Sequence, residues 1–200
     1  MAVQNANRFG LAQNTEGSCL ALIQRWLVDH RWSVVEPIPT KDHENFLTPA
    51  EAEAFQGKDY GTAWDWLMAQ PTFYVPPQWK RESRGASTWG EFLTDVRGCI
   101  GAGYPVATIL FVVLDAGTDP APTAMFLVQD KLLPMKVNPT TGKFGAHSVV
   151  ITDIDDASIT VRVPRFGEAG NPVVYPLQEF EAAWSAIVNG GHEYIWLAPK

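Results

Sequence analysis

The hydrophobic periodicity of this chain changes once along its length, and the change limits the folds that it can adopt. In the first half, Leu20, Ile23 and Leu27 recur at the three- and four-residue spacing of an amphipathic helix. Beyond about residue 105 the pattern becomes that of β-strands, beginning with a continuous apolar run over 106–114. A helical first half and a strand-rich second half predict an α+β fold, with a central helix packed on an antiparallel sheet.

Local signals divide the chain into elements. Helices are predicted over residues 18–30, 48–55, 60–70, 88–101 and 176–188, and strands over residues 106–114, 124–130, 147–154, 158–163 and 193–197. Residues 1–16 are expected to be extended, and residues 71–86 to form an irregular surface loop. Capping boxes open the helices at Thr48 and Thr88, each with a Glu three residues later. The short polar turn at 155–157 predicts a β-hairpin.

Composition restricts the class of protein. The 200 residues fit one domain over 1–200, and the 46% hydrophobic content is enough for a substantial core. A net charge of −7 disfavours a dedicated nucleic-acid binder, which is usually basic. Two cysteines, Cys19 and Cys99, do not make a disulfide framework, and Cys99 is expected to be buried. No cluster has metal-ligand spacing, and no cofactor is expected.

The N-terminal residues and the apolar runs bear on location. Residues 1–10 lack the basic and apolar regions of a secretory signal. The longest apolar run, 106–114, is much shorter than the roughly 20 residues of a membrane-spanning helix. The sequence therefore predicts a protein of the producing cell's cytoplasm with no membrane span. Delivery to another cell would need a dedicated secretion system that reads no cleavable signal. The oligomeric state is left open.

Cys19 is the residue with the clearest chemical potential, because it opens the best-defined helix. Backbone N–H groups and the helix dipole at an N-terminus stabilise a thiolate, which is the nucleophilic form of cysteine. A nucleophilic cysteine also needs a base, and His147 follows two small residues and heads a strand. His30 lies about 16 Å away along the same helix and is better interpreted as a cation near the helix C-terminus. The simpler alternative is that Cys19 and His147 only pack.

The segments Gly17-Ser18-Cys19 with Trp26-Leu27, and Ala146 to Thr152 after them, resemble the papain-like clan of cysteine peptidases. The likeness is closest to the YopT-like effector cysteine proteases and more distant to the bacteriocin-leader peptidases. It covers about residues 13–30 and 144–197, in order and spacing. It implies Cys19 as nucleophile, His147 as general base, a protein or peptide substrate, and a bacterial effector or toxin.

The resemblance also implies an oxyanion donor just before the nucleophile, for which Gln13 and Asn14 are the candidates. The chain departs from the family at Val163, which occupies the usual position of the orienting Asp and cannot hydrogen-bond an imidazole. Hairpin geometry places residues 163–165 opposite His147, and none of them is an acceptor. Glu168 could replace the orienting Asp only if the loop after Phe166 folds back toward the site. Arg162 and Arg165, if they lay close, would depress the pKa of His147.

Three functions remain open at the level of sequence. The first is a cysteine hydrolase or acyl-transfer enzyme, in which protease, amidase, deamidase and transglutaminase chemistry all use a Cys–His pair. The second is a papain-like protein that has lost turnover and binds a protein partner, which the missing carboxylate favours. The third is a structural or chaperone-like α+β protein of unrelated topology. Reaction of Cys19 with iodoacetamide, and its dependence on His147, separates the first two.

Overall fold

The computed structural model describes residues 2–4, 12–13, 19–35, 59–70, 73–113, 144–163, 165–166, 172–185 and 192–200. Its helices are α1 (Cys19–Val35), α3 (Tyr60–Met68), α4 (Trp89–Gly101) and α6 (Leu177–Ser185). Its strands are β1 (Ala12–Gln13), β2 (Trp79–Ala86), β3 (Val106–Val113), β4 (Phe144–Ile154), β5 (Ser158–Arg162), β6 (Arg165–Phe166), β7 (Pro172–Pro176) and β8 (His192–Pro199).

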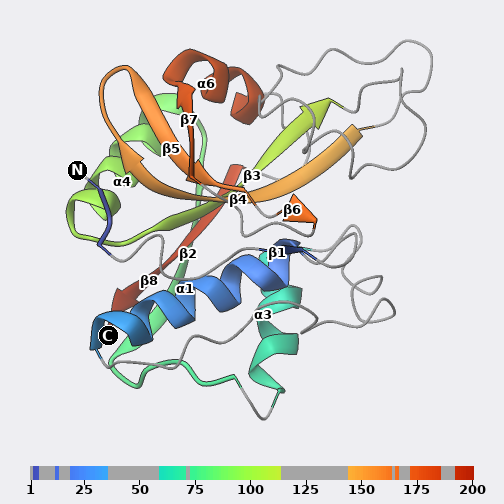
Figure 1. The fold of residues 1–200 in the computed structure, drawn as a ribbon, viewed down its shortest axis with the longest axis vertical. Coiled ribbons are helices and arrows are strands. Elements are labelled where there is room, and N and C mark those ends of the chain that lie inside the picture. The colour runs from blue at the N-terminus through green and yellow to red at the C-terminus, as the bar shows by residue number, and fades with distance from the viewer. Residues whose placement is uncertain are drawn as a thin grey trace.

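Six strands form one sheet in the order β2-β8-β3-β4-β5-β7, and every pairing in it is antiparallel (Figure 1). The last strand in sequence, β8, therefore lies between β2 and β3. A separate two-stranded sheet joins β1 to β6 in parallel, with Gln13 opposite Phe166. The long antiparallel sheet and its helices confirm the α+β class predicted from the periodicity.

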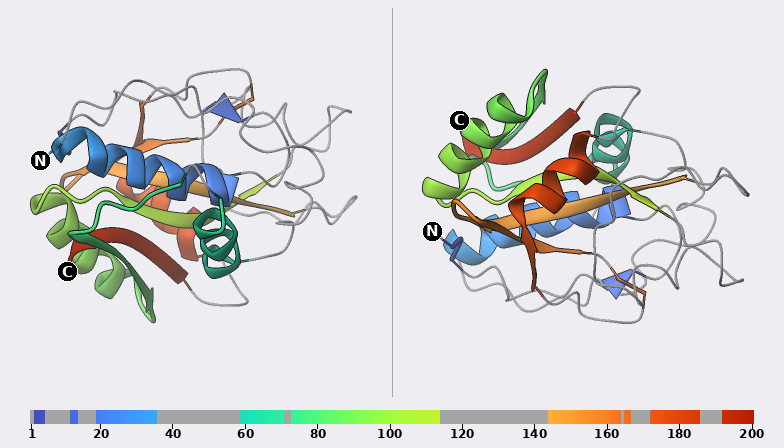
Figure 2. Two further views of the ribbon diagram at one scale, coloured as in Figure 1. Left: turned by 90° about the horizontal axis from the view of Figure 1, so that it is seen from below. Right: turned by 90° about the horizontal axis from the view of Figure 1, so that it is seen from above.

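Helices cover both faces of the six-stranded sheet (Figure 2). The core is accordingly divided into two clusters of buried side chains, one with α1 and α3 and the other with α4 and α6. Strand β4 contributes to both, because side chains alternate along a strand. Val150 belongs to the cluster of α1, whereas Val149 and Ile151 belong to the cluster of α4 and α6.

Helix α1 is the central helix that the apolar stripe predicts. Leu22, Ile23 and Trp26 are almost fully buried against the sheet and α3. The helix continues to Val35, five residues beyond the predicted end at His30. The prediction that His30 is a C-terminal cation is wrong, because the ring is fully buried and burial lowers its pKa to about 4. His30 is therefore neutral at pH 7.

Helix α4 confirms the capping box. The Thr88 hydroxyl accepts a hydrogen bond from the Glu91 backbone N–H, and the Glu91 carboxylate accepts one from the Thr88 backbone N–H. After the helix ends at Gly101, Gly103 takes a positive φ of 80°, which a residue without Cβ adopts without strain. Gly103, the last of the small residues that end the predicted helix, therefore lets the chain turn away after α4.

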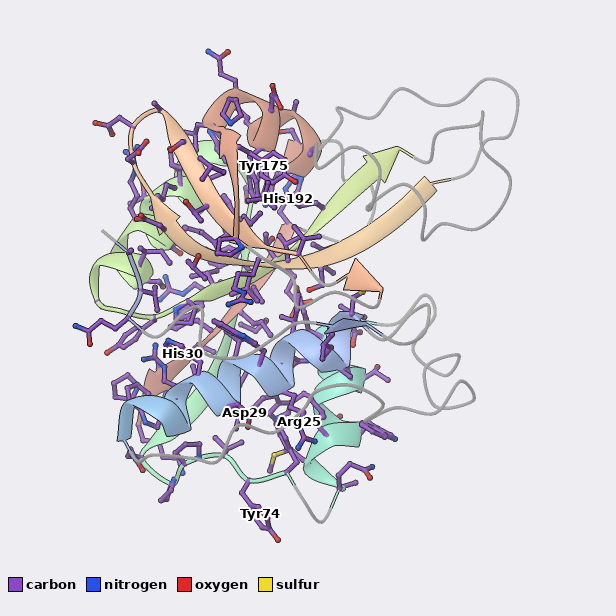
Figure 3. The ribbon with its side chains drawn as sticks, in the orientation of Figure 1. Arg25, Asp29, His30, Tyr74, Tyr175 and His192 are labelled. Atoms are coloured by element: carbon purple, nitrogen blue, oxygen red, sulfur yellow. The ribbon has the colours of Figure 1, made fainter. Side chains whose placement is uncertain are left out.

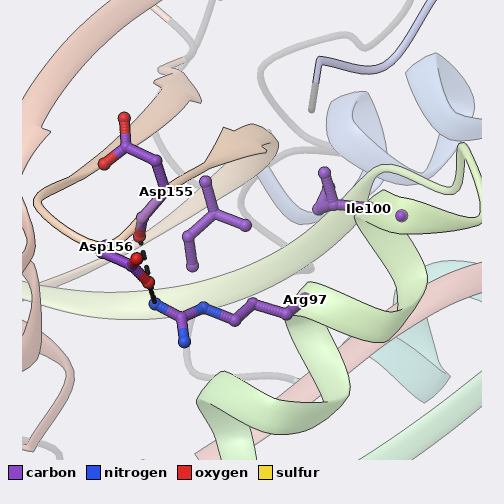
Figure 4. A pocket seen from close by; sticks show the side chains of 6 residues that line it. Arg97, Ile100, Asp155 and Asp156 are labelled. Atoms are coloured by element: carbon purple, nitrogen blue, oxygen red, sulfur yellow. Dashed lines mark hydrogen bonds and ion pairs between the residues drawn. The ribbon is translucent and has the colours of Figure 1, made fainter.

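The predicted hairpin is also confirmed. Strands β4 and β5 pair antiparallel and are connected by the turn at 155–157. The Asp155 carboxylate accepts hydrogen bonds from the backbone N–H groups of Ala157 and Ser158, at 2.7 and 2.6 Å. Arg97 of α4 reaches the same turn, donating to the Asp155 carbonyl at 3.2 Å and to the Asp156 carboxylate at 2.9 Å (Figure 4). The turn is therefore fixed both from within and from the neighbouring helix.

Several predicted elements need correction. Residues 79–86, expected within an irregular loop, form the edge strand β2, so the first half is not purely helical. The short strand β7 was not predicted. Helix α6 covers Leu177–Ser185, and residues 186–188 of the predicted helix lie outside the described residues. The helix predicted over 48–55 and the strand predicted over 124–130 lie outside the described residues.

Candidate functional site

Cys19 is the first residue of α1, and its side chain is 8% exposed. The thiol receives backbone hydrogen bonds from Cys19 itself and from Leu20, which are the free N–H groups of a helix N-terminus, and a third from Ser148 of β4. Burial nevertheless raises the thiol pKa above its ordinary value, and the three hydrogen bonds only partly oppose that effect. Among the described residues, then, Cys19 has the expected amide donors but lies in surroundings that favour the neutral thiol.

His147 is adjacent in sequence to Ser148, the residue that contacts the Cys19 thiol. Its backbone belongs to β4 and pairs with Leu110 of β3. Successive Cα atoms are about 3.8 Å apart, so the backbone of His147 lies close to the Cys19 site. The structure describes the backbone of His147 but not the position of its imidazole. Leu110, its partner in register, packs in the cluster of α4 and α6.

Two other histidines are in the wrong place to act on Cys19. Figure 3 labels His30 beside α1 and His192 near α6. His30 stacks on Trp26 and is eleven residues along the helix from Cys19, about 16 Å at 1.5 Å per residue. His192 stacks on Trp184 of α6, with ring centroids 3.7 Å apart, in the cluster on the other face of the sheet. His43 lies outside the described residues.

The other predicted site residues are described only in part. The backbone of Gln13 lies in β1, and β1 with β6 lies toward the N-terminal end of α1 (Figure 1). Asn14 and Glu168 lie outside the described residues. Val163 is buried in the cluster of α4 and α6, as expected of an apolar side chain. The described pairing of β4 with β5 ends at Val150 and Arg162, before the predicted neighbours of His147.

Arg162 occupies a defined position against α1. Its guanidinium lies over the Trp26 ring, 5.9 Å from the centroid, and its side chain is 3% exposed. Burial lowers its pKa to about 10, so it remains charged at neutral pH. The side chain of Arg165 lies outside the described residues.

Two residues beside Cys19 were not singled out by the sequence. The Tyr60 hydroxyl at the start of α3 is hydrogen-bonded to the Ser148 hydroxyl, and both side chains are buried. Tyr60 belongs to the same buried cluster as Cys19 and interacts with it electrostatically. Residues 60 and 148 are 88 positions apart, so only the tertiary fold joins them. The local signal available was the Asp59 N-cap, which marks where α3 begins.

The described part of the chain contains no group of three His, Cys, Asp or Glu side chains arranged to hold a metal ion. Within that same part, no helix combines the length and apolar character needed to cross a membrane.

Comparisons with known proteins give a limited result. No family model matches the chain, and no curated protein matches it. Among solved structures, a chain from Bacillus anthracis designated a C39-like peptidase superposes with a TM-score of 0.49 and 15% sequence identity. The superposition covers 100% of this chain and 98% of that one. A likeness of this size does not assign the chain to a family.

Proposed function

We propose that this protein is a papain-like cysteine hydrolase or acyl-transfer enzyme, in which Cys19 is the nucleophile and His147 the general base. The observation that carries the proposal is the contact between the first residue of α1 and Ser148 of β4. It brings a cysteine at a helix N-terminus against the strand residue next to a histidine. Backbone amide donors at a helix N-terminus supply one half of what nucleophilic cysteine catalysis requires, and the proposal requires in addition that the His147 imidazole reach the thiol.

In the proposed reaction, His147 takes the proton of Cys19 and the thiolate attacks a substrate carbonyl. The tetrahedral oxyanion is held by the Cys19 backbone N–H and by the side-chain amide of Gln13 or Asn14. Collapse of this intermediate expels an amine, which receives the proton from His147, and leaves an acyl group on Cys19. Water or a second amine then releases the acyl group, giving hydrolysis or transfer.

A buried thiol with a raised pKa needs an imidazolium neighbour to become a thiolate near neutral pH. The rate of alkylation of Cys19 by iodoacetamide against pH tests this directly. The Cys99→Ala variant serves as the reference protein, so that the rate reports one thiol. If the pair is active, removing the base in His147→Ala should slow alkylation at pH 6–7 at least about tenfold, as expected for loss of an opposite charge. Equal rates with and without His147 would refute the activated pair.

Turnover is tested with a library of fluorogenic peptide amides. The reference protein should release the fluorophore, and Cys19→Ala should not. Replacing the true oxyanion donor, in Gln13→Ala or Asn14→Ala, should reduce turnover about 10²–10³-fold while leaving the alkylation profile unchanged. Glu168→Gln is the matching test of the substitute third residue, and a changed pH profile would support that role.

A second candidate function is a papain-like protein that binds a partner without turnover. The burial of Cys19, which favours its neutral thiol, and the apolar Val163 both favour it. This alternative predicts no fluorophore release from any peptide of the library and alkylation that rises only above the ordinary thiol pKa. The two functions therefore differ in both measurements.

The substrate class follows from the same proposal. We propose a peptide or amide bond in a protein target, with protease, amidase, deamidase and transglutaminase chemistry separated by the products. A role as an effector delivered to another cell rests only on the resemblance to the YopT-like proteases.

A further inference from the structure

We propose that Tyr60 is a positioning residue for Cys19, acting through its hydrogen bond to the Ser148 side chain. The inference rests on the proposed role of Cys19 as nucleophile and deepens it, since it names what holds one of the thiol's three backbone donors. Ser148 takes part in both contacts. Its side chain is hydrogen-bonded to the Tyr60 hydroxyl, and its backbone N–H is hydrogen-bonded to the Cys19 thiol.

Tyr60 is itself held firmly. It is the first residue of α3, and the Asp59 side chain caps that helix by accepting a hydrogen bond from the Thr62 backbone N–H at 2.8 Å. Its backbone carbonyl accepts a hydrogen bond from the side-chain amide of Gln24, a fully buried residue of α1, at 3.0 Å. The Tyr60 side chain is 0% exposed. A group with this support has little freedom to follow a movement of β4.

Gln24 ties this arrangement back to the nucleophile's own helix. Its amide also donates to the Leu20 carbonyl at 3.3 Å, one turn earlier in α1, and its side-chain oxygen accepts a hydrogen bond from Arg81 of β2 at 3.2 Å. The first turn of α1, the start of α3 and the Ser148 segment of β4 are therefore connected through buried hydrogen bonds. In such a network a donor is held in place more firmly than packing alone would hold it.

The ionisable groups that act on Tyr60 keep its hydroxyl neutral. Burial raises its pKa well above the ordinary value, the hydrogen bond to Ser148 opposes part of that rise, and the electrostatic interactions with Cys19 of α1 and Glu193 of β8 add to it. Burial raises the pKa of the Cys19 thiol as well. His147 flanks the site in sequence on β4. Tyr60 therefore acts as a neutral hydrogen-bonding group and does not supply a proton at neutral pH.

The consequence for chemistry concerns the thiolate. A backbone N–H directed at sulfur stabilises the anion and lowers the thiol pKa. When the Tyr60–Ser148 bond is lost, Ser148 is free to shift, its N–H is less well directed at sulfur, and the pKa of Cys19 rises. Tyr60→Phe is the sharpest test, because it removes only the hydroxyl and keeps the ring that fills the core. Ser148→Ala removes the same bond from β4.

The experiment measures the pH profile of Cys19 alkylation by iodoacetamide in the Cys99→Ala reference protein, with circular dichroism to show that each variant is folded. We expect both Tyr60→Phe and Ser148→Ala to move the midpoint upward by about half a pH unit or more, which is a roughly threefold lower thiolate fraction below the midpoint. The double variant should show the shift of one single variant rather than the sum, because both substitutions remove one bond.

Tyr194→Phe is the matched control. Tyr194 is a buried tyrosine of β8 whose hydroxyl donates to Asp95 at 2.5 Å, in the cluster on the other face of the sheet. Its profile should superimpose on that of the reference protein. A folded Tyr60→Phe or Ser148→Ala variant with an unshifted profile would overturn the proposal, and so would an equal shift in Tyr194→Phe. If Tyr60→Phe does not fold, Ser148→Ala alone decides the outcome.

The same series in a His147→Ala background separates this inference from the proposed function. The Ser148 backbone donor does not depend on the imidazole, so the Tyr60→Phe shift should persist there. Failure of the Cys19–His147 pair would show as equal alkylation with and without His147, whereas failure of the positioning role would show as no shift in either background.

Discussion

The imidazole of His30 stacks on the indole of Trp26 within α1, with ring centroids 5.2 Å apart and planes inclined by 15°. The His30 ring is fully buried, and its Nε2–H donates to the Gln4 carbonyl at 2.7 Å. Burial is the main cause that lowers its pKa to about 4, with a smaller contribution from the charge of Arg31. The N-terminal segment is thus attached to α1 through a histidine that must remain neutral.

Folding stability should therefore decrease as the pH falls from about 6.5 to about 4. In this range the unfolded chain binds a proton at His30 and the folded chain does not, so protonation favours unfolding. The stabilising effect is complete above pH 6.5 and is lost as the pH falls through the folded-state pKa. A difference of about 2.5 pKa units corresponds to about 3 kcal/mol. Urea unfolding at several pH values measures this loss.

The control for this prediction is His30→Gln, which has no group that titrates in the same range. Its overall stability should be lower because the stacking on Trp26 is lost, but its stability should depend much less on pH between 4 and 6.5. Equal pH dependence in the two proteins would mean that other groups cause the loss.

Elements with strong local signals were predictable from the sequence. Thr88 and Glu91 form a capping box from two side chains within one turn, so their geometry depends little on the rest of the fold. The hairpin at Asp155 was predictable for the same reason, because the carboxylate bonds to backbone groups two and three residues later. The position of Cys19 at a helix start also followed from local periodicity.

Features that depend on distant residues were not predictable. Strand β2 carries Lys80, Arg81, Glu82 and Arg84, a composition with no apolar alternation, because it lies at a sheet edge and pairs only with β8. The raised pKa of Cys19 depends on how deeply the sheet and α3 bury the start of α1. The Tyr60–Ser148 hydrogen bond likewise joins one helix position to one strand position, and no local sequence pattern relates the two.

The capping box of α4 makes a quantitative prediction. Thr88→Ala removes the acceptor of the Glu91 N–H and should lower the free energy of unfolding by about 1 kcal/mol, as is typical of N-cap threonines. The matched control is Thr94→Ala in the same helix, since the Thr94 hydroxyl donates to the Gly90 carbonyl and caps nothing. Thr94→Ala should leave stability unchanged or raise it slightly, because alanine has the higher helix propensity. Equal losses would contradict a capping role.

Arg31 connects α1 to the segment after α4 and the start of β2. Its guanidinium lies 4.6 Å from the centroid of the Trp79 ring and 4.5 Å from that of Tyr104, and it donates to the Gly103 carbonyl at 3.0 Å. Lysine keeps the charge but has no planar group to stack between two rings. Arg31→Lys should therefore lower the free energy of unfolding by about 1–2 kcal/mol, measured in urea.

The control for Arg31 is Arg25→Lys in the same helix. The Arg25 side chain is 12% exposed, and its Nε lies 3.9 Å from the Asp29 carboxylate, a pair whose charges a lysine would keep. Arg25→Lys keeps the charge of this pair and should lower the free energy of unfolding by less than Arg31→Lys does. A loss as large as that of Arg31→Lys would show that guanidinium stacking is not the cause.

Two adjacent aspartates in the β4–β5 turn should differ in their effect on stability. Asp155 accepts hydrogen bonds from two backbone N–H groups and from the Ser158 hydroxyl, which holds its pKa below the ordinary value. Asp156 makes only an exposed ion pair with Arg97 among the described residues. Asp155→Ala should lower the urea midpoint clearly, while Asp156→Ala should leave it nearly unchanged, since exposed ion pairs contribute little.

Because the folded-state pKa of Asp155 is depressed, its contribution is present above the ordinary carboxyl pKa and is lost as the pH falls through the folded-state value. The difference between the two variants should therefore be clear at pH 7 and disappear in strong acid. Equal midpoints at pH 7 would mean that the backbone, and not the Asp155 side chain, determines the turn.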